Sequence, residues 1–193
     1  PGAIPPLKEE LRQAEAVVRV AEVSNALPVS DIASLFEQET LAELQHCRID
    51  HADNLIQNDG CTTITTTGTH SVSLVLDFGQ TQPGRVIFDL DGPTGTIVDF
   101  TYSERLHDDG RVHMHKGIPG FDIYAAHRLI LREGRQTWEA FELSGFRYLQ
   151  VTIRHCERPL SIHAIQLNFS AYPVQPRGHF SCSDDLLNRI WQA

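Results

Sequence analysis

The chain has 193 residues, 41% of them hydrophobic, which is enough to form a buried core. Its 25 acidic residues outnumber its 16 lysines and arginines, and the net charge of -9 disfavours nucleic acid as a partner. The longest apolar runs are strand-sized, so no membrane partner is expected. The first residues lack the charged head and apolar run of a signal peptide. Because the chain starts with Pro1 rather than Met, the sequence leaves localisation open.

The first sixty residues are expected to form an extended entry segment and a short helical region. The prolines of "PGAIPPLKEE" fix φ and disfavour helix in the residues before them. The β-branched run in "AEAVVRVAEV" favours a strand, although its alanines and glutamates also suit a helix. In "VSDIASLFEQETLAELQHC", Ser30 can cap a short helix. The apolar residues that can share its face are Ile32, Leu35, Phe36 and Leu44.

From Cys61 onward, apolar residues recur with a period of 2 between Gly, Pro, Asp and Asn punctuation. The predicted strands are 61–67, 71–78, 85–91, 95–104, a strand near Val112, 121–131, 137–143, 146–155 and 160–172. No crossover helices separate them. The fold class is therefore mainly β, with residues 61–175 forming an antiparallel β-sandwich of the jelly-roll or concanavalin-like kind.

Residues 176–193 are expected to be a linker followed by a helix that is cut short. Ser183 can cap this helix, and the acids after it favour the positive end of the helix dipole. Its apolar residues form one stripe of Leu186, Leu187, Ile190 and Trp191. A helix this short is marginal alone in water, so the stripe needs a partner. That partner is either the preceding sheets or a region outside this chain.

The cysteines are Cys47, Cys61, Cys156 and Cys182, with no C-x-x-C pair among them. Four cysteines allow three disulfide pairings, which sequence does not rank. We expect four free thiols, mostly buried.

Glycosidase chemistry needs two carboxylates flanking the scissile bond. Glu104, Glu139 and Glu142 are candidates only as carboxylates on strands, and no spacing specifies a catalytic pair. Solvated or salt-bridged positions on a sheet face are the simpler interpretation. Nucleophile-elbow, P-loop and dinucleotide-binding motifs are missing from the sequence.

The run "LHDDGRVHMH" is the most metal-like feature, because Asp-Gly favours a hairpin tip and places histidines on both arms. His107, His113 and His115 could converge on a zinc-type ion. Histidines on an exposed hairpin without metal are the simpler interpretation, so no metal or other cofactor is assigned. Loop acids could likewise bind calcium, although exposed turn acids explain them as well. These acids are Asp89, Asp91, Asp108 and Asp109.

Arg147 in "GFRYLQVTI" alternates with apolar residues and lies on their side of the strand. A guanidinium there needs an acceptor. We expect a structural ion pair with Glu104 or Asp122.

Taken in order, these segments resemble the α-L-rhamnosidases of glycoside hydrolase family 78. "LVLDFGQTQPGRVIFDLDGPTGTIVDFTYSERLHDDGRV" is similar to the family's Asp-Phe-Gly strand, glycine-rich hairpin and Tyr-x-Glu-x-Leu strand. "GFDIY", "WEAFEL" and "GFRYLQV" resemble its later strands, and "FSCSDDLLNRIWQA" resembles the entry to an (α/α)6 barrel. The matched residues are Tyr102, Glu104, Leu106, Asp122, Tyr124, Trp138, Gly145, Phe146, Arg147 and Tyr148.

The resemblance implies a parent enzyme that removes terminal α-L-rhamnose with inversion, using carboxylates on the barrel beyond Ala193. No catalytic residue is therefore transferred to this chain, and the matched residues are expected to have packing and strand-pairing roles. The leading hypothesis is a non-catalytic module that supports the barrel, with rhamnose-containing glycan as the parent's substrate. The alternatives are a stand-alone carbohydrate-binding module and a structural interaction domain.

Overall fold

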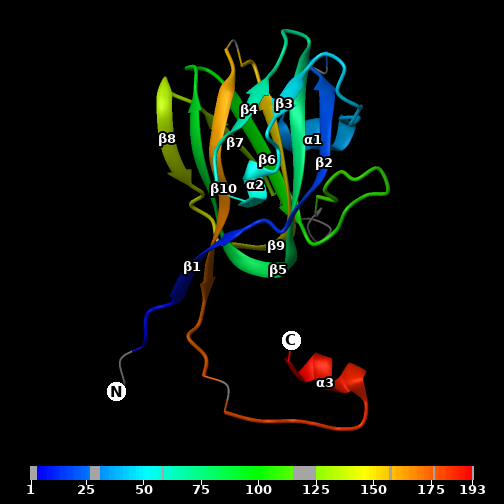
Figure 1. The fold of residues 1–193 in the computed structure, drawn as a ribbon, viewed down its shortest axis with the longest axis vertical. Coiled ribbons are helices and arrows are strands. Elements are labelled where there is room, and N and C mark those ends of the chain that lie inside the picture. The colour runs from blue at the N-terminus through cyan, green and yellow to red at the C-terminus, as the bar shows by residue number, and fades with distance from the viewer. Residues whose placement is uncertain are drawn as a thin grey trace.

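The structure is a computed structural model that describes residues 4–26, 31–57, 59–114, 125–156, 158–175 and 177–192. Its described strands form one 10-stranded sheet in which every pairing between strands is antiparallel. The strands are β1 (Lys8–Gln13), β2 (Ala16–Ser24), β3 (Arg48–Asp50), β4 (Thr62–Thr65), β5 (His70–Gly92), β6 (Ile97–Ser103), β7 (Ala126–Ile130), β8 (Gly134–Glu139), β9 (Ser144–Arg154) and β10 (Leu160–Ala171). Figure 1 shows them as an upright body, with α3 lying apart from it.

The long strand β5 bends and so contributes to two layers. Its first part pairs with β2 and β9, and its last part pairs with β8 and β10. The bend lies at a register shift between Asp77 and Gln82, where Gly79 has φ +78°. One layer runs β7-β6-β9-β5-β2 and the other β8-β5-β10-β4-β3, with β1 beside β10. The prediction of a mainly antiparallel β fold is confirmed, and the two strands predicted at 71–78 and 85–91 are one.

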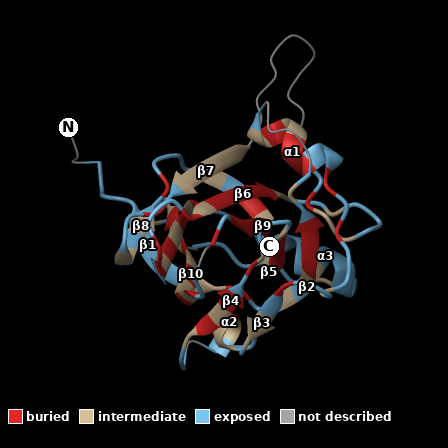
Figure 2. Ribbon diagram, turned by 90° about the horizontal axis from the view of Figure 1, so that it is seen from above, coloured by how far each residue is buried: buried red, intermediate tan, exposed pale blue. Residues whose placement is uncertain are grey.

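The core lies between these layers, where Figure 2 shows buried residues lining the inside of the curved sheet. Phe88 and Phe100 meet there at a ring-centroid distance of 5.1 Å, and Trp138 stacks on Phe88 at 6.2 Å. Phe78 and Phe146 form an edge-to-face pair at 5.7 Å. Large aromatic side chains with no exposed surface give the two layers a common interior.

A buried ionic group ties a helix to the outer side of the first layer. Arg154 on β9 donates to Asp99 on β6 at 2.8 Å and also pairs with Glu39. Arg128 on β7 adds two hydrogen bonds to Asp99, at 2.7 and 2.8 Å. Glu39 is the C-cap of α1 (Ile32–Gln38), so the group fixes the end of that helix. Burial raises the pKa of Glu39 although Arg154 opposes the change.

The first sixty residues contribute strands to the sheet. β1 pairs with β10, β2 with β5 and β3 with β4, although β1 and β3 were expected to be part of an extended and helical region. The division of the chain at residues 60 and 175 stays a prediction. Helix α1 is capped by Asp31, whose carboxylate accepts from Ser34 N at 2.7 Å. The predicted cap, Ser30, lies outside the described residues. A further short helix is α2 (Asn54–Gln57).

The C-terminal helix α3 (Asp185–Gln192) forms as predicted, but its cap is Asp184 rather than Ser183. The Asp184 carboxylate accepts from the backbone of Leu186 at 2.8 Å, because it lies one residue nearer to the first free amides. No described residue of α3 is buried. The helix contacts its own approach segment, where Phe180 lies 5.7 Å from Trp191. The described part of the sheet does not cover the apolar stripe.

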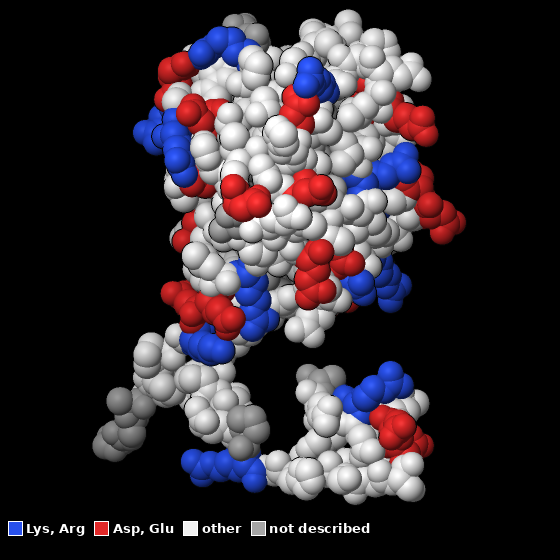
Figure 3. All heavy atoms as spheres, viewed as in Figure 1, with Lys and Arg blue, Asp and Glu red and all other residues white. Residues whose placement is uncertain are grey.

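The surface charges and the cysteines are distributed over the whole fold. On the face seen in Figure 3, basic and acidic groups are interspersed and form no large basic field. All four cysteines are free, with Cys47 and Cys156 buried. Among the described residues, no helix has the length and apolar character needed to cross a membrane.

Candidate functional site

The segment that follows β6 forms the predicted hairpin. Gly110 sits at its tip with φ +83°, a conformation that glycine adopts without strain. The backbone N–H of His107 donates to Arg111 O at 2.8 Å, and that of His113 donates to Arg105 O at 2.9 Å. These bonds pair His107 with Arg111 and Arg105 with His113, so His107 and His113 are diagonal neighbours across the hairpin.

The hairpin is held against the outer face of the first layer. Leu106 and Val112 join a small apolar cluster with β2 and β5, and Val112 N donates to the buried Gln150 side chain at 2.9 Å. Arg111 donates from its guanidinium to the carbonyl oxygen of Glu37 at 2.9 Å. The hairpin is thereby fixed to both the sheet and the end of α1.

A cavity of about 880 Å³ opens between the hairpin, α1 and the start of β9. Its lining residues are Phe36, Glu37, Tyr102, Ser103, Glu104, Arg105, His107, Arg111, Val112, His113, Met114, Ala125, Ser144 and Gly145. The lining contains both apolar and hydrogen-bonding groups. Such a wall suits a small polar ligand that also has an apolar face.

A hydrogen-bonded chain lies at one side of the cavity. The Tyr102 hydroxyl lies 2.6 Å from Ser144 Oγ and 3.0 Å from His127 Nε2. Burial raises the pKa of Tyr102 and lowers that of His127, so both groups are neutral near pH 7. Because the Tyr102 hydroxyl contacts both His127 and Ser144, it can hold the Ser144 hydroxyl in position to meet a hydroxyl group of a ligand.

Two of the three histidines considered as metal ligands lie within the described residues. The rings of His107 and His113 lie 4.5 Å apart, whereas His115 lies outside the described residues. Burial, with the neighbouring His113, lowers the pKa of His107. Within the described residues, no third metal-ligating side chain joins these two. The two histidine rings line the cavity and can form hydrogen bonds with a ligand there.

Only one of the three candidate carboxylates lines the cavity. Glu104 lines the cavity, but Glu139 accepts from Asn168 at 2.9 Å elsewhere, and Glu142 lies 4.0 Å from His127. Of the proposed calcium ligands, Asp89 pairs with Arg135 at 2.8 Å and Asp109 pairs with Arg111 at 2.6 Å. The carboxylate oxygens of Asp89 and Asp109 are therefore engaged in ion pairs.

The expected pairing of Arg147 with Glu104 is wrong, and Asp122 lies outside the described residues. Arg147 makes a two-pronged ion pair with Asp77, with both N–O distances 2.8 Å. The register places Asp77 opposite Tyr148, which brings its carboxylate beside the guanidinium. The hydrogen bond from Arg147 outweighs burial and lowers the pKa of Asp77. The interaction links β5 to β9.

The residues that carry the sequence resemblance fall into separate environments. Tyr102, Glu104 and Gly145 line the cavity, and Leu106 anchors the hairpin beside it. Trp138 and Phe146 belong to the core. Asp122 and Tyr124 lie outside the described residues. Ser144, His127 and Arg111, which complete the site, carry no signal in the sequence that marks them as partners.

Comparison with known proteins identifies the family. Residues 67–168 match the bacterial α-L-rhamnosidase concanavalin-like domain. The chain belongs to this family. The match covers more than half of the chain, including β5 to β9 and the hairpin.

Individual rhamnosidases also resemble this concanavalin-like domain. The GH78 rhamnosidase of Bacillus sp. GL1 shares 29% identity and superposes with a TM-score of 0.63, covering 80% of this chain and 15% of the enzyme. The α-L-rhamnosidase of Formosa agariphila is 28% identical over 60% of this chain and 12% of its own length. The rhamnosidase of Klebsiella oxytoca, solved with rhamnose bound, shares the fold at a TM-score of 0.58 and 16% identity, covering 97% of this chain and 34% of its own. The chain thus spans a minor part of each relative.

Proposed function

We propose that this chain is a non-catalytic β-sandwich module of a GH78-type α-L-rhamnosidase, acting as a rigid support for a helical catalytic domain. The observation that carries the proposal is the match of residues 67–168 to the concanavalin-like domain of that family. Of Glu104, Glu139 and Glu142, only Glu104 lines the cavity, which supports the proposal because glycoside hydrolysis needs two carboxylates on either side of one bond.

Helix α3 supports the docking part of the proposal. Its Leu187 and Trp191 side chains are 48% and 56% exposed, and Leu186 and Ile190 extend the same stripe. Burying such a stripe contributes about 1.5–3 kcal/mol per large side chain. In this proposal, the partner that covers the stripe is the helical catalytic domain of the parent enzyme.

Hydrolysis of an aryl α-L-rhamnoside by the purified chain tests the proposal. We expect no release of the aryl group above that of buffer, with a complete rhamnosidase as the positive control. Turnover that Glu104→Gln abolishes would overturn the proposal, since it would place catalysis in this cavity.

The cavity favours a second candidate, the binding of a sugar without catalysis. Tyr102, Ser144 and His107 offer neutral hydrogen-bonding groups, while Phe36 and Met114 offer an apolar side. Deoxy sugars present both kinds of surface. Calorimetric titration with L-rhamnose should give a millimolar or tighter site that Tyr102→Phe weakens. Binding that the variant leaves unchanged would exclude this cavity.

A further inference from the structure

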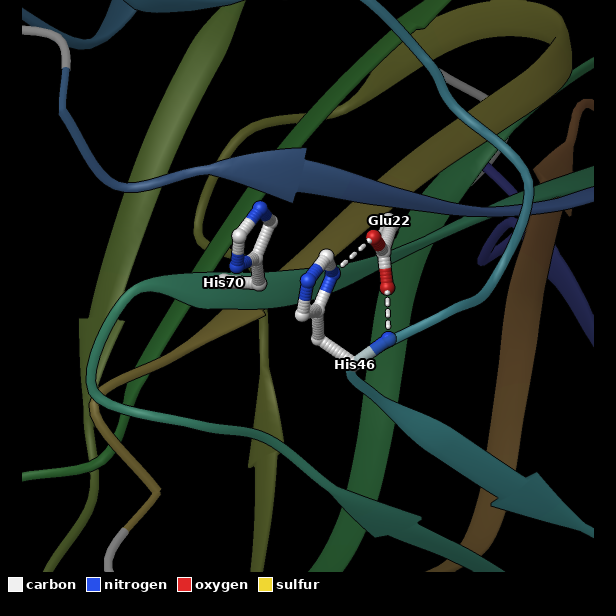
Figure 4. A group of neighbouring side chains, drawn as sticks. All are labelled: Glu22, His46 and His70. Atoms are coloured by element: carbon white, nitrogen blue, oxygen red, sulfur yellow. Dashed lines mark hydrogen bonds and ion pairs between the residues drawn. The ribbon is translucent and has the colours of Figure 1, made fainter.

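Three metal-ligating side chains from distant parts of the sequence meet at the start of β5, and none of them lines the hairpin cavity. Glu22 on β2, His46 in the segment before β3 and His70 at the start of β5 each place one ligand atom within 4.8 Å of the others. Among the described residues, this is the only such group. Figure 4 shows the His46 ring between the Glu22 carboxylate and the His70 ring.

Glu22 is fixed and charged. Its Oε2 accepts backbone N–H bonds from Gln45 at 2.9 Å, His46 at 2.8 Å and Cys47 at 3.1 Å. Burial opposes ionisation, but the hydrogen bonds from His46 and these backbone groups prevail and lower the pKa of Glu22 to about 2. The side chain is only 4% exposed, so its second oxygen is held in one direction.

That second oxygen orients His46. Glu22 Oε1 lies 2.7 Å from His46 Nδ1, and a carboxylate in this position accepts a hydrogen bond from the ring N–H. Neutral His46 then carries its lone pair on Nε2, the atom that faces away from Glu22. A histidine backed by a carboxylate in this way is the usual arrangement of a zinc-ligating imidazole.

His70 offers a second imidazole beside the first. Its ring stacks on His46 with centroids 4.0 Å apart and an interplanar angle of 4°, and its Nδ1 lies 2.9 Å from Thr69 Oγ1. When Thr69 accepts from that nitrogen, Nε2 of His70 is also free. Parallel rings hold their lone pairs in parallel planes, so one ring must turn before both reach one ion. His46 is held by Glu22, so the movement falls on His70.

We propose that His46 and His70 bind one divalent transition-metal ion of the zinc type, with Glu22 as the outer partner that orients His46. Imidazole nitrogen suits zinc, copper and nickel, and the half-exposed His46 leaves room for water or a ligand in the remaining positions. The ion would join β2, the segment before β3 and the start of β5. This site is independent of the proposed rhamnosidase role.

Zinc titration of the full chain, free of any histidine tag, tests the proposal by calorimetry. We expect one site whose affinity falls at least about 10-fold in His70→Ala, since a ligand is removed. Glu22→Gln should weaken binding about 10–100-fold through the lost orientation of His46. His179→Ala, which changes an exposed histidine away from the cluster, is the matched control and should bind as the unchanged chain does. Equal zinc affinity in His70→Ala and the unchanged chain, or no binding by the unchanged chain, would overturn the proposal.

Two further readouts separate metal binding from a folding defect and from thiol binding. Zinc should raise the thermal unfolding midpoint of the unchanged chain but not that of His70→Ala, because only a site in the folded state stabilises it. Cobalt should give the weak visible bands of nitrogen and oxygen ligands. An intense near-ultraviolet thiolate band would place the ion on a cysteine instead and contradict the proposal.

Discussion

The sandwich and helix α3 contain similar large apolar residues in opposite surroundings. Phe88 and Phe100 have no exposed surface between the two layers, whereas Leu187 and Trp191 on α3 are about half exposed. The sandwich therefore has a buried aromatic interior of its own. Helix α3 presents an apolar surface that the described part of the sandwich does not cover. Under the proposed function, the sandwich is the support and α3 is the element that would dock on the catalytic domain.

The largest expected effect is in the shared core. Phe100→Ala removes a ring that contacts Phe88, Trp138 and His127, and it should lower the free energy of unfolding by about 3–5 kcal/mol. Urea unfolding followed by circular dichroism measures it. A loss below about 1 kcal/mol would mean that the two layers do not depend on this interior.

The buried ionic group should be nearly as sensitive. Arg154→Met leaves Glu39 and one side of Asp99 without their cation, which should cost about 3 kcal/mol in the free energy of unfolding. Arg128→Met is the matched comparison, because Arg128 is partly exposed and Arg154 still serves Asp99. An equal or larger loss in Arg128→Met would show that Arg154 is not central.

The third effect depends on pH and belongs to Glu22. Because its pKa is lowered to about 2 from the usual 4.5, its ionised form stabilises the fold above pH 4.5, and this contribution is lost as pH falls toward 2. The stability difference between the unchanged chain and Glu22→Gln should therefore shrink over that interval. A difference that stays constant with pH would contradict the role of the ionised carboxylate.

The smallest effect on stability is expected on α3. The double change Leu187→Ser and Ile190→Ser alters exposed side chains, so the free energy of unfolding should stay within about 0.5 kcal/mol. Self-association should fall, because the exposed stripe is lost. Light scattering on a sizing column measures this self-association. A purely monomeric unchanged chain would show that the stripe does not promote association.

Local pattern predicted most of the sheet and little of the site. The strand predicted at 85–91 is present, and its alternating residues Val86, Phe88 and Leu90 are buried, since side-chain period is a local property. The sequence predicts two strands where the structure has β5 alone. The continuity of β5 through its bend depends on a change of pairing partners, which no local pattern records. The ion pair of Arg147 with Asp77 was not predicted either. The two residues are 70 positions apart, and the register between β5 and β9 brings them together.

The cluster of Glu22, His46 and His70 shows the same limit. The two histidines lie on opposite sides of β3, β4 and α2 in sequence, and no short motif joins them. The pairing of β2 with β5 brings Glu22 opposite Val72, and the hydrogen bonds from residues 45–47 then bring His46 onto it. Only the folded sheet places the three groups together.

Amide hydrogen exchange in the unchanged chain compares the two regions most directly. The account predicts strong protection along β9, which pairs on both sides, and rapid exchange along α3, whose apolar stripe has no cover from the described sandwich. Protection of α3 equal to that of β9 in a monomeric sample would contradict the account, because the helix would then be packed within this chain and not free to dock on a catalytic domain.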